Sequence, residues 1–150
     1  MSWLRDLKNH PKLKERKLRR SQLIKRLKTL RELFLSVDIE GLLEEMNSEL
    51  LDGEGEVIRS PILDEIDVMY PEELSTEELR DIMEEIVIGQ PEELCSLEWE
   101  DNILTVCYYL SDLDGSDFKL IIGNEAVPLE EEAIKQALVR AFEKILEKRS

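Results

Sequence analysis

The chain has few of the residues that most often perform catalysis or bind metals: one histidine and two cysteines among 150 residues. The histidine, His10, precedes Pro11 near the N-terminus and lies far along the sequence from Cys95 and Cys107. Both cysteines therefore lack a nearby imidazole that could activate a thiol nucleophile. No glycine-rich phosphate-binding loop occurs either. We therefore predict a protein that is not an enzyme and that holds neither a metal nor a cofactor.

An acidic loop at residues 112–117 is the segment that most resembles a metal site. It combines Asp112, Asp114 and Asp117 with Gly115. The glycine comes too early for an EF-hand, and no glutamate stands at the twelfth position of the loop. Aspartate and glycine are also ordinary turn residues. We therefore predict a turn between two strands.

Long apolar runs are absent as well. No stretch approaches the roughly 20 apolar residues that a spanning helix needs. The N-terminus lacks the uninterrupted apolar core and the small-residue cleavage site of a secretory signal. Two cysteines do not make a disulfide scaffold. These absences predict a cytoplasmic protein with reduced thiols.

Charge is abundant, and its two signs are separated along the chain. The net charge is −15. Residues 1–35 carry twelve Lys or Arg against three acids, a net charge of +9, whereas residues 36–150 carry eight basic residues against thirty-two acids, a net charge of −24. Opposite fields of this kind steer association between molecules and suppress wrong encounters. The pattern indicates a basic arm on an acidic body.

The arm has a helical pattern. Leu23, Leu27, Leu30 and Phe34 recur at spacings of four, three and four residues, as on one face of a helix at about 12–35. The first half of this helix is almost entirely basic and carries little of the apolar stripe. We therefore expect it to project from the body unless a partner covers it.

A second helical pattern follows directly. Asp38 is a predicted N-cap, because an aspartate there precedes apolar residues at helical spacing. Those residues are Ile39, Leu42, Leu43, Met46 and Leu50. The short link between the two stripes predicts a helical hairpin, which Gly53 and Gly55 end. We place a boundary there between a basic helical arm, residues 1–52, and an acidic domain, residues 56–150.

The acidic domain combines strands and helices. Ser75 and Glu78 form a capping box that opens a helix at 75–88, and Pro128 is the predicted first residue of a helix at 128–148. Alternating or continuous apolar runs predict strands at 95–99, 103–110 and 118–122. The predicted fold class is α+β: an N-terminal helical hairpin followed by a small antiparallel sheet packed against two helices.

The first helix carries the candidate binding residues. We expect a non-enzymatic protein-interaction or assembly module, which self-associates through the apolar stripe and binds a protein partner by charge complementarity. The alternative is a nucleic-acid-associated protein whose cations contact phosphates, although no aromatic residues interleave them to stack on bases. Trp3, Leu4 and Leu7 followed by cations are also typical of a membrane-surface anchor. The candidate electrostatic residues are Lys12, Arg16, Arg19, Arg20, Lys25 and Arg26, and the apolar ones are Leu23, Leu27, Leu30 and Phe34.

The register of the predicted hairpin decides whether the two cysteines can meet. A two-residue loop at 101–102 places Leu97 opposite Val106 and keeps the apolar side chains on one face. The same register sends Cys95 and Cys107 to opposite faces. A three-residue loop would face the cysteines across the hairpin but would spoil the apolar face.

We therefore predict two free thiols and no disulfide. A thiol titration of the folded protein, without reductant, checks this prediction. A count of two is expected, and a lower count would contradict it.

Overall fold

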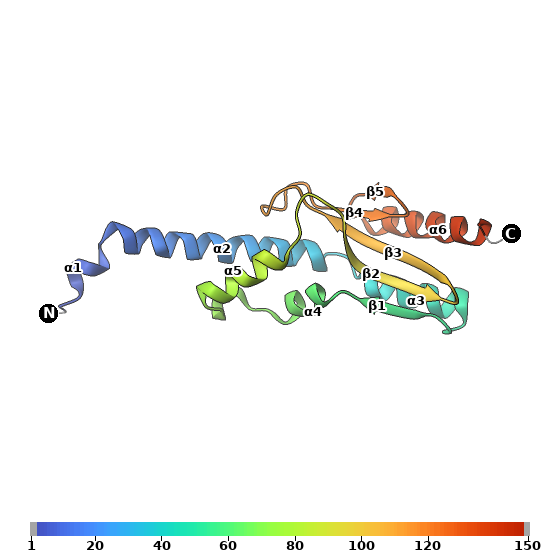
Figure 1. The fold of residues 1–150 in the computed structure, drawn as a ribbon, viewed down its shortest axis with the longest axis horizontal. Helices are drawn as coiled ribbons and strands as arrows, with labels where there is room; N and C mark the ends of the chain where they lie inside the picture. The colour runs from blue at the N-terminus through green and yellow to red at the C-terminus, as the bar shows by residue number, and fades with distance from the viewer. Residues whose placement is uncertain (1–2, 149–150) are drawn as a thin grey trace.

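The computed structural model describes residues 3–148 and has an α+β fold (Figure 1). Its strands form one antiparallel sheet in the order β1-β2-β3-β4-β5. The strands are β1 (Glu56–Arg59), β2 (Glu92–Trp99), β3 (Asn102–Tyr109), β4 (Lys119–Ile122) and β5 (Glu125–Val127). The helices are α1 (Arg5–Lys8), α2 (Pro11–Leu35), α3 (Ile39–Leu51), α4 (Pro61–Val68), the 3-10 helix η1 (Pro71–Glu73), α5 (Thr76–Glu85) and α6 (Glu131–Glu147).

Two helices cover one face of the sheet. Helix α3 packs against β1 and β2, and α6 packs against β3, β4 and β5. The sheet residues beneath them are apolar and buried: Leu97, Leu104, Val106, Leu120 and Ile122. The antiparallel sheet is confirmed, but α3 covers it where we predicted the helix at 75–88. That helix, α5, packs against α2 instead.

The predicted helical hairpin is wrong, although both of its helices form. Helix α3 continues in the same direction as α2 and does not fold back along it (Figure 1). Asp38 caps α3 as predicted, since its Oδ1 accepts a hydrogen bond from the Gly41 amide at 2.9 Å. The two helices do not pair because each packs against other elements of the chain. Helix α2 packs on α4, η1 and α5, whereas α3 packs on the sheet.

Two short elements, α4 and β5, were absent from the prediction. Pro61, which breaks the β-like runs of residues 56–69, is the first residue of α4. Residues 71–73 form η1, and Val127 pairs with Leu120 in β5. Because β5 holds residues 125–127 in the sheet, the last helix begins at Glu131 and not at Pro128.

The β2–β3 hairpin turns one residue earlier than predicted. Trp99 pairs with Asn102, and Glu100 in the turn has a positive φ of 51°. Leu97 therefore lies opposite Leu104 and not Val106. The predicted faces survive this error, because a shift of two residues leaves every side chain on its own side of the sheet.

The two cysteines are free and differ in exposure. Cys95 is buried and Cys107 is half-buried. Burial raises the pKa of the Cys95 thiol to about 12, so very little reactive thiolate forms at neutral pH. A titration of the folded protein should therefore detect Cys107 alone. The predicted count of two for the folded protein is therefore corrected to one, and both thiols should react only after unfolding, because neither is in a disulfide.

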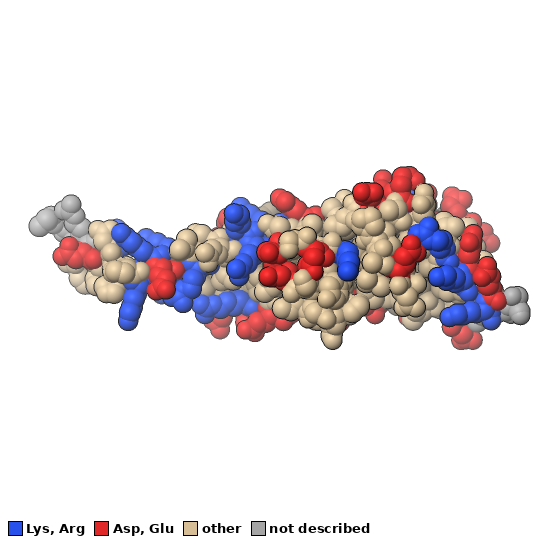
Figure 2. Space-filling model, turned by 90° about the horizontal axis from the view of Figure 1, so that it is seen from above, with Lys and Arg blue, Asp and Glu red and all other residues tan. Residues whose placement is uncertain are grey.

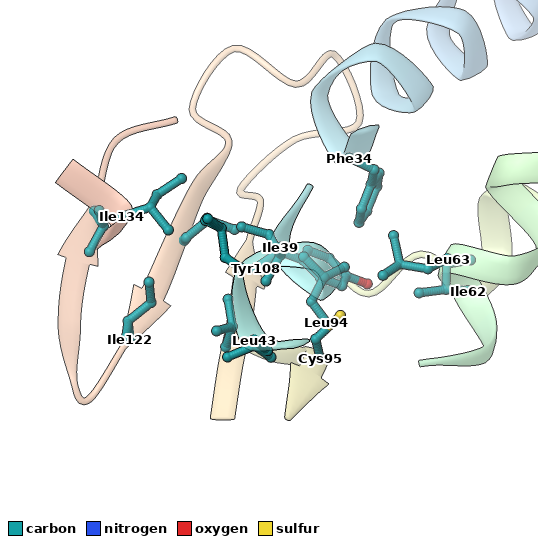
Figure 3. Packing of buried hydrophobic residues seen from close by; sticks show 14 of the residues in the cluster. Phe34, Ile39, Leu43, Ile62, Leu63, Leu94, Cys95, Tyr108, Ile122 and Ile134 are labelled. Atoms are coloured by element: carbon teal, nitrogen blue, oxygen red, sulfur yellow. The ribbon is translucent and has the colours of Figure 1, made fainter. Parts of the chain in front are cut away.

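The hydrophobic core draws on both sides of the predicted boundary. Leu27 and Leu30 of α2 have no exposed surface, and Phe34 is 3% exposed. Figure 3 shows Phe34 at the end of α2, close to Leu63 of α4 and Tyr108 of β3. The rings of Phe34 and Tyr108 meet edge to face, with centroids 4.8 Å apart. The stripe of α2 thus joins the α4–α5 region to the sheet in one core.

This burial predicts a large stability difference between two leucines of the same helix. Leu30→Ala should lower the free energy of unfolding by about 2–5 kcal/mol, because it leaves a cavity in the core. Leu18→Ala, at a position 59% exposed, should change it by no more than about 0.5 kcal/mol. Urea denaturation of both variants provides the measurement. Equal, small effects would contradict the burial of the stripe.

Candidate functional site

A helical arm extends beyond the core. Residues 11–19 of α2 are all exposed, and they lie past the region where α2 packs on α5 (Figure 1). The helix starts there because His10 Nδ1 accepts a hydrogen bond from the Lys12 amide at 3.1 Å and Pro11 occupies the first position. The single histidine therefore has a capping role.

Three of the candidate basic residues, Lys12, Arg16 and Arg19, lie on this arm, and the others lie further along α2. In Figure 2, Lys and Arg side chains follow the N-terminal extension, while Asp and Glu are spread over the body. Lys12, Arg16, Arg19, Lys25 and Arg26 are exposed. Their side chains form no hydrogen bond or ion pair with another residue of the described chain. These five cations remain available to a partner.

Other cations of the same helix hold it to the body. Arg20 donates to Thr76 Oγ1 at 3.4 Å and to the Glu72 carbonyl at 3.3 Å. Arg31 donates to the carbonyls of Ile66 and Asp67 at 3.1 and 3.2 Å, where α4 ends. Those carbonyls are the negative end of the α4 dipole, so a guanidinium stabilises them. Lys28 forms an ion pair with Glu72.

The apolar candidates are buried or half-buried, whereas most of the basic ones are exposed. Leu27, Leu30 and Phe34 are buried inside the chain, and Leu23 is half-buried against the core. Side chains without exposed surface offer no contact to a second molecule. The structure therefore uses the stripe for the core, and it separates the apolar candidates from the basic ones.

A recess at the base of the arm was missed by the sequence analysis. It lies between α1, α2 and the start of α5, and its lining includes Lys8, Leu13, Arg16, Lys17 and Thr76. Four cations, counting Arg20, surround about 440 Å³ of space. Leu13, Arg16 and Arg20 continue the buried face of α2 beyond the core, at the spacing of three and four residues. The helical period could have identified this face, but the position of α5 could not be known.

An acidic groove lies between α4, η1 and α5. Its carboxylates are Glu65, Glu73, Glu78 and Asp81, and its apolar lining is Val68, Met69, Tyr70, Leu74 and Ile82. No lysine or arginine lines it. Two of its apolar residues are unusually exposed, Val68 at 74% and Tyr70 at 65%. The groove thus offers negative charge around an accessible apolar surface.

Arg59 forms a separate cluster of charges. Its guanidinium lies 2.9 Å from Glu40, 2.9 Å from Asp64 and 3.4 Å from Asp67, and it donates to the Leu63 carbonyl at 3.0 Å. These partners belong to α3 and α4, while Arg59 ends β1. The cluster ties three elements together, so we assign it a structural role.

The acidic loop between β3 and β4 uses its carboxylates on its own backbone. Asp114 Oδ1 accepts from the Ser116 amide at 2.8 Å, and the Asp117 carboxylate accepts from the Ser111 amide at 3.0 Å. These hydrogen bonds lower the pKa of both aspartates. Gly115 allows the loop to approach α2 closely, since a Cβ there would lie 2.6 Å from Leu33 Cδ1. The loop therefore packs on the helix as a self-bonded turn.

Neither thiol is activated as a nucleophile. Burial raises the pKa of Cys107 as well as that of Cys95, and Glu93 and Glu92 raise it further. Within residues 3–148, no group of three or more His, Cys, Asp and Glu side chains is placed to hold a metal ion. None of the helices in this range combines the length and apolar character needed to cross a membrane.

Comparison with known proteins gives no relative: no protein family, curated protein or solved structure matches the chain. The arm, the recess and the acidic groove are therefore the features from which a function is argued.

The acidic groove leads to a prediction about pH. Glu65 shares a hydrogen bond with Glu85, and this bond, burial and the charge of Glu85 raise the pKa of Glu65 above its usual value of 4.5. A raised carboxyl pKa means that the folded state binds the proton more tightly than the unfolded state does. The pair therefore adds stability as the pH falls toward that pKa, and costs stability at neutral pH.

Glu85→Gln should relieve this repulsion. We expect a small rise in the free energy of unfolding at neutral pH and a weaker dependence on pH between neutrality and pH 4.5. Urea denaturation at several pH values measures both. Glu84→Gln, the same change at the exposed neighbouring position, is the control. Equal effects of the two variants would show that net charge, and not the pair, is responsible.

Proposed function

We propose that this chain is a non-enzymatic protein-interaction module that binds an acidic protein surface through its basic arm. The observation that carries the proposal is that one half of α2 is packed in the core and the other half is exposed. Its C-terminal half is committed to the core through Leu27, Leu30 and Phe34. The side chains of the exposed cations Lys12, Arg16 and Arg19 in its N-terminal half form no hydrogen bond or ion pair with another described residue.

The recess supports an anionic partner in particular. Cations on α1 and α2 converge on it, and Thr76 adds a hydroxyl group. Carboxylates of a partner could accept hydrogen bonds from Arg16 in the two-pronged geometry that a guanidinium group favours, whereas Arg20 already donates to Thr76 and to the Glu72 carbonyl. The apolar part of such a contact comes from Leu13, which lines the recess and is 39% exposed, and not from the buried stripe.

Nucleic acid is the competing ligand for the same cations. The phosphates of a nucleic acid would bind these lysines and arginines as well as the carboxylates of a protein would. Two features favour protein: the rest of the chain has a net charge of −24, which repels a polyanion outside the arm, and the exposed cations are not interleaved with aromatic side chains that could stack on bases.

Neutralising the arm should weaken binding to an acidic polypeptide. The variant combines Lys12→Ser, Arg16→Ser and Arg19→Ser, and leaves Arg20 in place because it contacts α5. Each lost ion pair at the surface is worth about 0.5 kcal/mol, so the three together should weaken binding about tenfold. Fluorescence anisotropy with labelled poly-L-glutamate at low salt gives the dissociation constants.

The control variant removes three exposed lysines of the last helix: Lys135→Ser, Lys144→Ser and Lys148→Ser. It makes the same change in net charge and should bind as the wild type does. A labelled DNA duplex is titrated in parallel. Tighter binding of DNA than of poly-L-glutamate, together with nucleic acid that copurifies and is stripped by salt, would replace the proposal by its alternative.

A further inference from the structure

We infer that the acidic partner of the arm is a second copy of this chain, and that its acidic groove between α4 and α5 receives the arm. The inference rests on the proposed function and names the surface that the arm binds. It is carried by charge complementarity between two surfaces of one molecule. Each surface lacks a partner of opposite charge within the described chain.

The groove is suited to a basic amphipathic helix. Glu73 and Asp81 form no ion pair with a described residue, and no cation lines the groove. Glu65 lines the groove and shares a hydrogen bond with the neighbouring Glu85, so a further carboxylate lies next to it. Val68 lies exposed among these carboxylates. A partner with both cations and an apolar side chain would pair with the carboxylates and cover the exposed Val68.

The outer face of the arm brings that combination. Leu18 precedes the buried Leu27 by nine residues, or two and a half helical turns, so it lies on the opposite side of α2. Lys14 and Lys25 lie on the same outer face, four residues before and seven residues after Leu18. All three are exposed. Leu18 can therefore enter the apolar part of a groove while the lysines reach carboxylates at its rim.

The arm cannot reach the groove of its own chain. Helix α2 is continuous from Pro11 to Leu35, and Arg20 fixes it to Thr76 and η1 on its own side of α5. Folding the arm back across α5 would break this helix. A second molecule has no such restriction, and a two-fold axis lets each copy place its arm in the groove of the other.

Charge reversal on either surface tests the inference. Lys14→Glu with Lys25→Glu reverses the arm, and Glu73→Lys with Asp81→Lys reverses the groove. Glu78 is left unchanged because it completes the capping box of α5. Light scattering after size exclusion, at micromolar protein, should give twice the chain mass of 17.5 kDa for the wild type. Each double variant should be monomeric, with the dissociation constant of the dimer raised at least about tenfold.

Mixing the two double variants should restore the dimer, because each then offers an arm and a groove that complement the other. Combining all four changes in one chain should restore it as well. Lys144→Glu with Lys148→Glu, which reverses two exposed cations of α6, is the matched control and should remain dimeric. Circular dichroism confirms that every variant is folded.

The outcomes separate this inference from the proposed function. A monomeric wild type that still binds poly-L-glutamate through its arm would overturn the second copy as partner and leave the arm's role intact. Loss of the dimer in the arm variant alone would show that the arm sits elsewhere and not in the groove. Failure of the mixture to reassociate would likewise exclude direct pairing of the two surfaces.

Discussion

Leu27, Leu30 and Phe34 carry α2 into the core, and the arm exists because the helix continues beyond the point where that core ends. With 25 residues, α2 is about 37 Å long, whereas its partners α4 and α5 have eight and ten residues. Burial of the stripe sets the position of α2 against both short helices and the sheet. The exposed half then follows as a rigid continuation of a helix whose other half is fixed.

The cations of α2 are divided by the same geometry. Arg20, Lys28 and Arg31 face the body, where they bind carbonyls of α4 and η1, the Glu72 carboxylate of η1 and the Thr76 hydroxyl of α5. Residues one or two positions away point elsewhere, because successive residues of a helix are turned by about 100°. The basic residues that are neighbours in the sequence therefore lie on two faces of the helix. Those on one face stabilise the docked helix, and those on the other face point outward.

This division explains what the sequence could and could not predict. Local signals succeeded: Asp38, Ser75 and Glu78 cap the helices as predicted, because a cap depends on a few adjacent residues. The spacing of Leu27 and Leu30 indicated correctly that one face of α2 is buried, but periodicity does not say against what. We predicted the hairpin and self-association through the stripe, and missed the recess, because the sequence does not show which elements α2 packs against. One of these elements is the short helix α4, which no periodic pattern indicated.

The separation of charge along the chain has a consequence for folding as well as for binding. An acidic body of net charge −24 repels itself, and the crowding of Glu65 and Glu85 is the local sign of it. Cations close to those carboxylates would relieve the repulsion, yet the cap at His10 and the docking of Arg20 keep the arm straight and directed away from its own body. On the proposed function, contact of the arm with another acidic surface would relieve this repulsion, so the same helix that completes the core would also favour association.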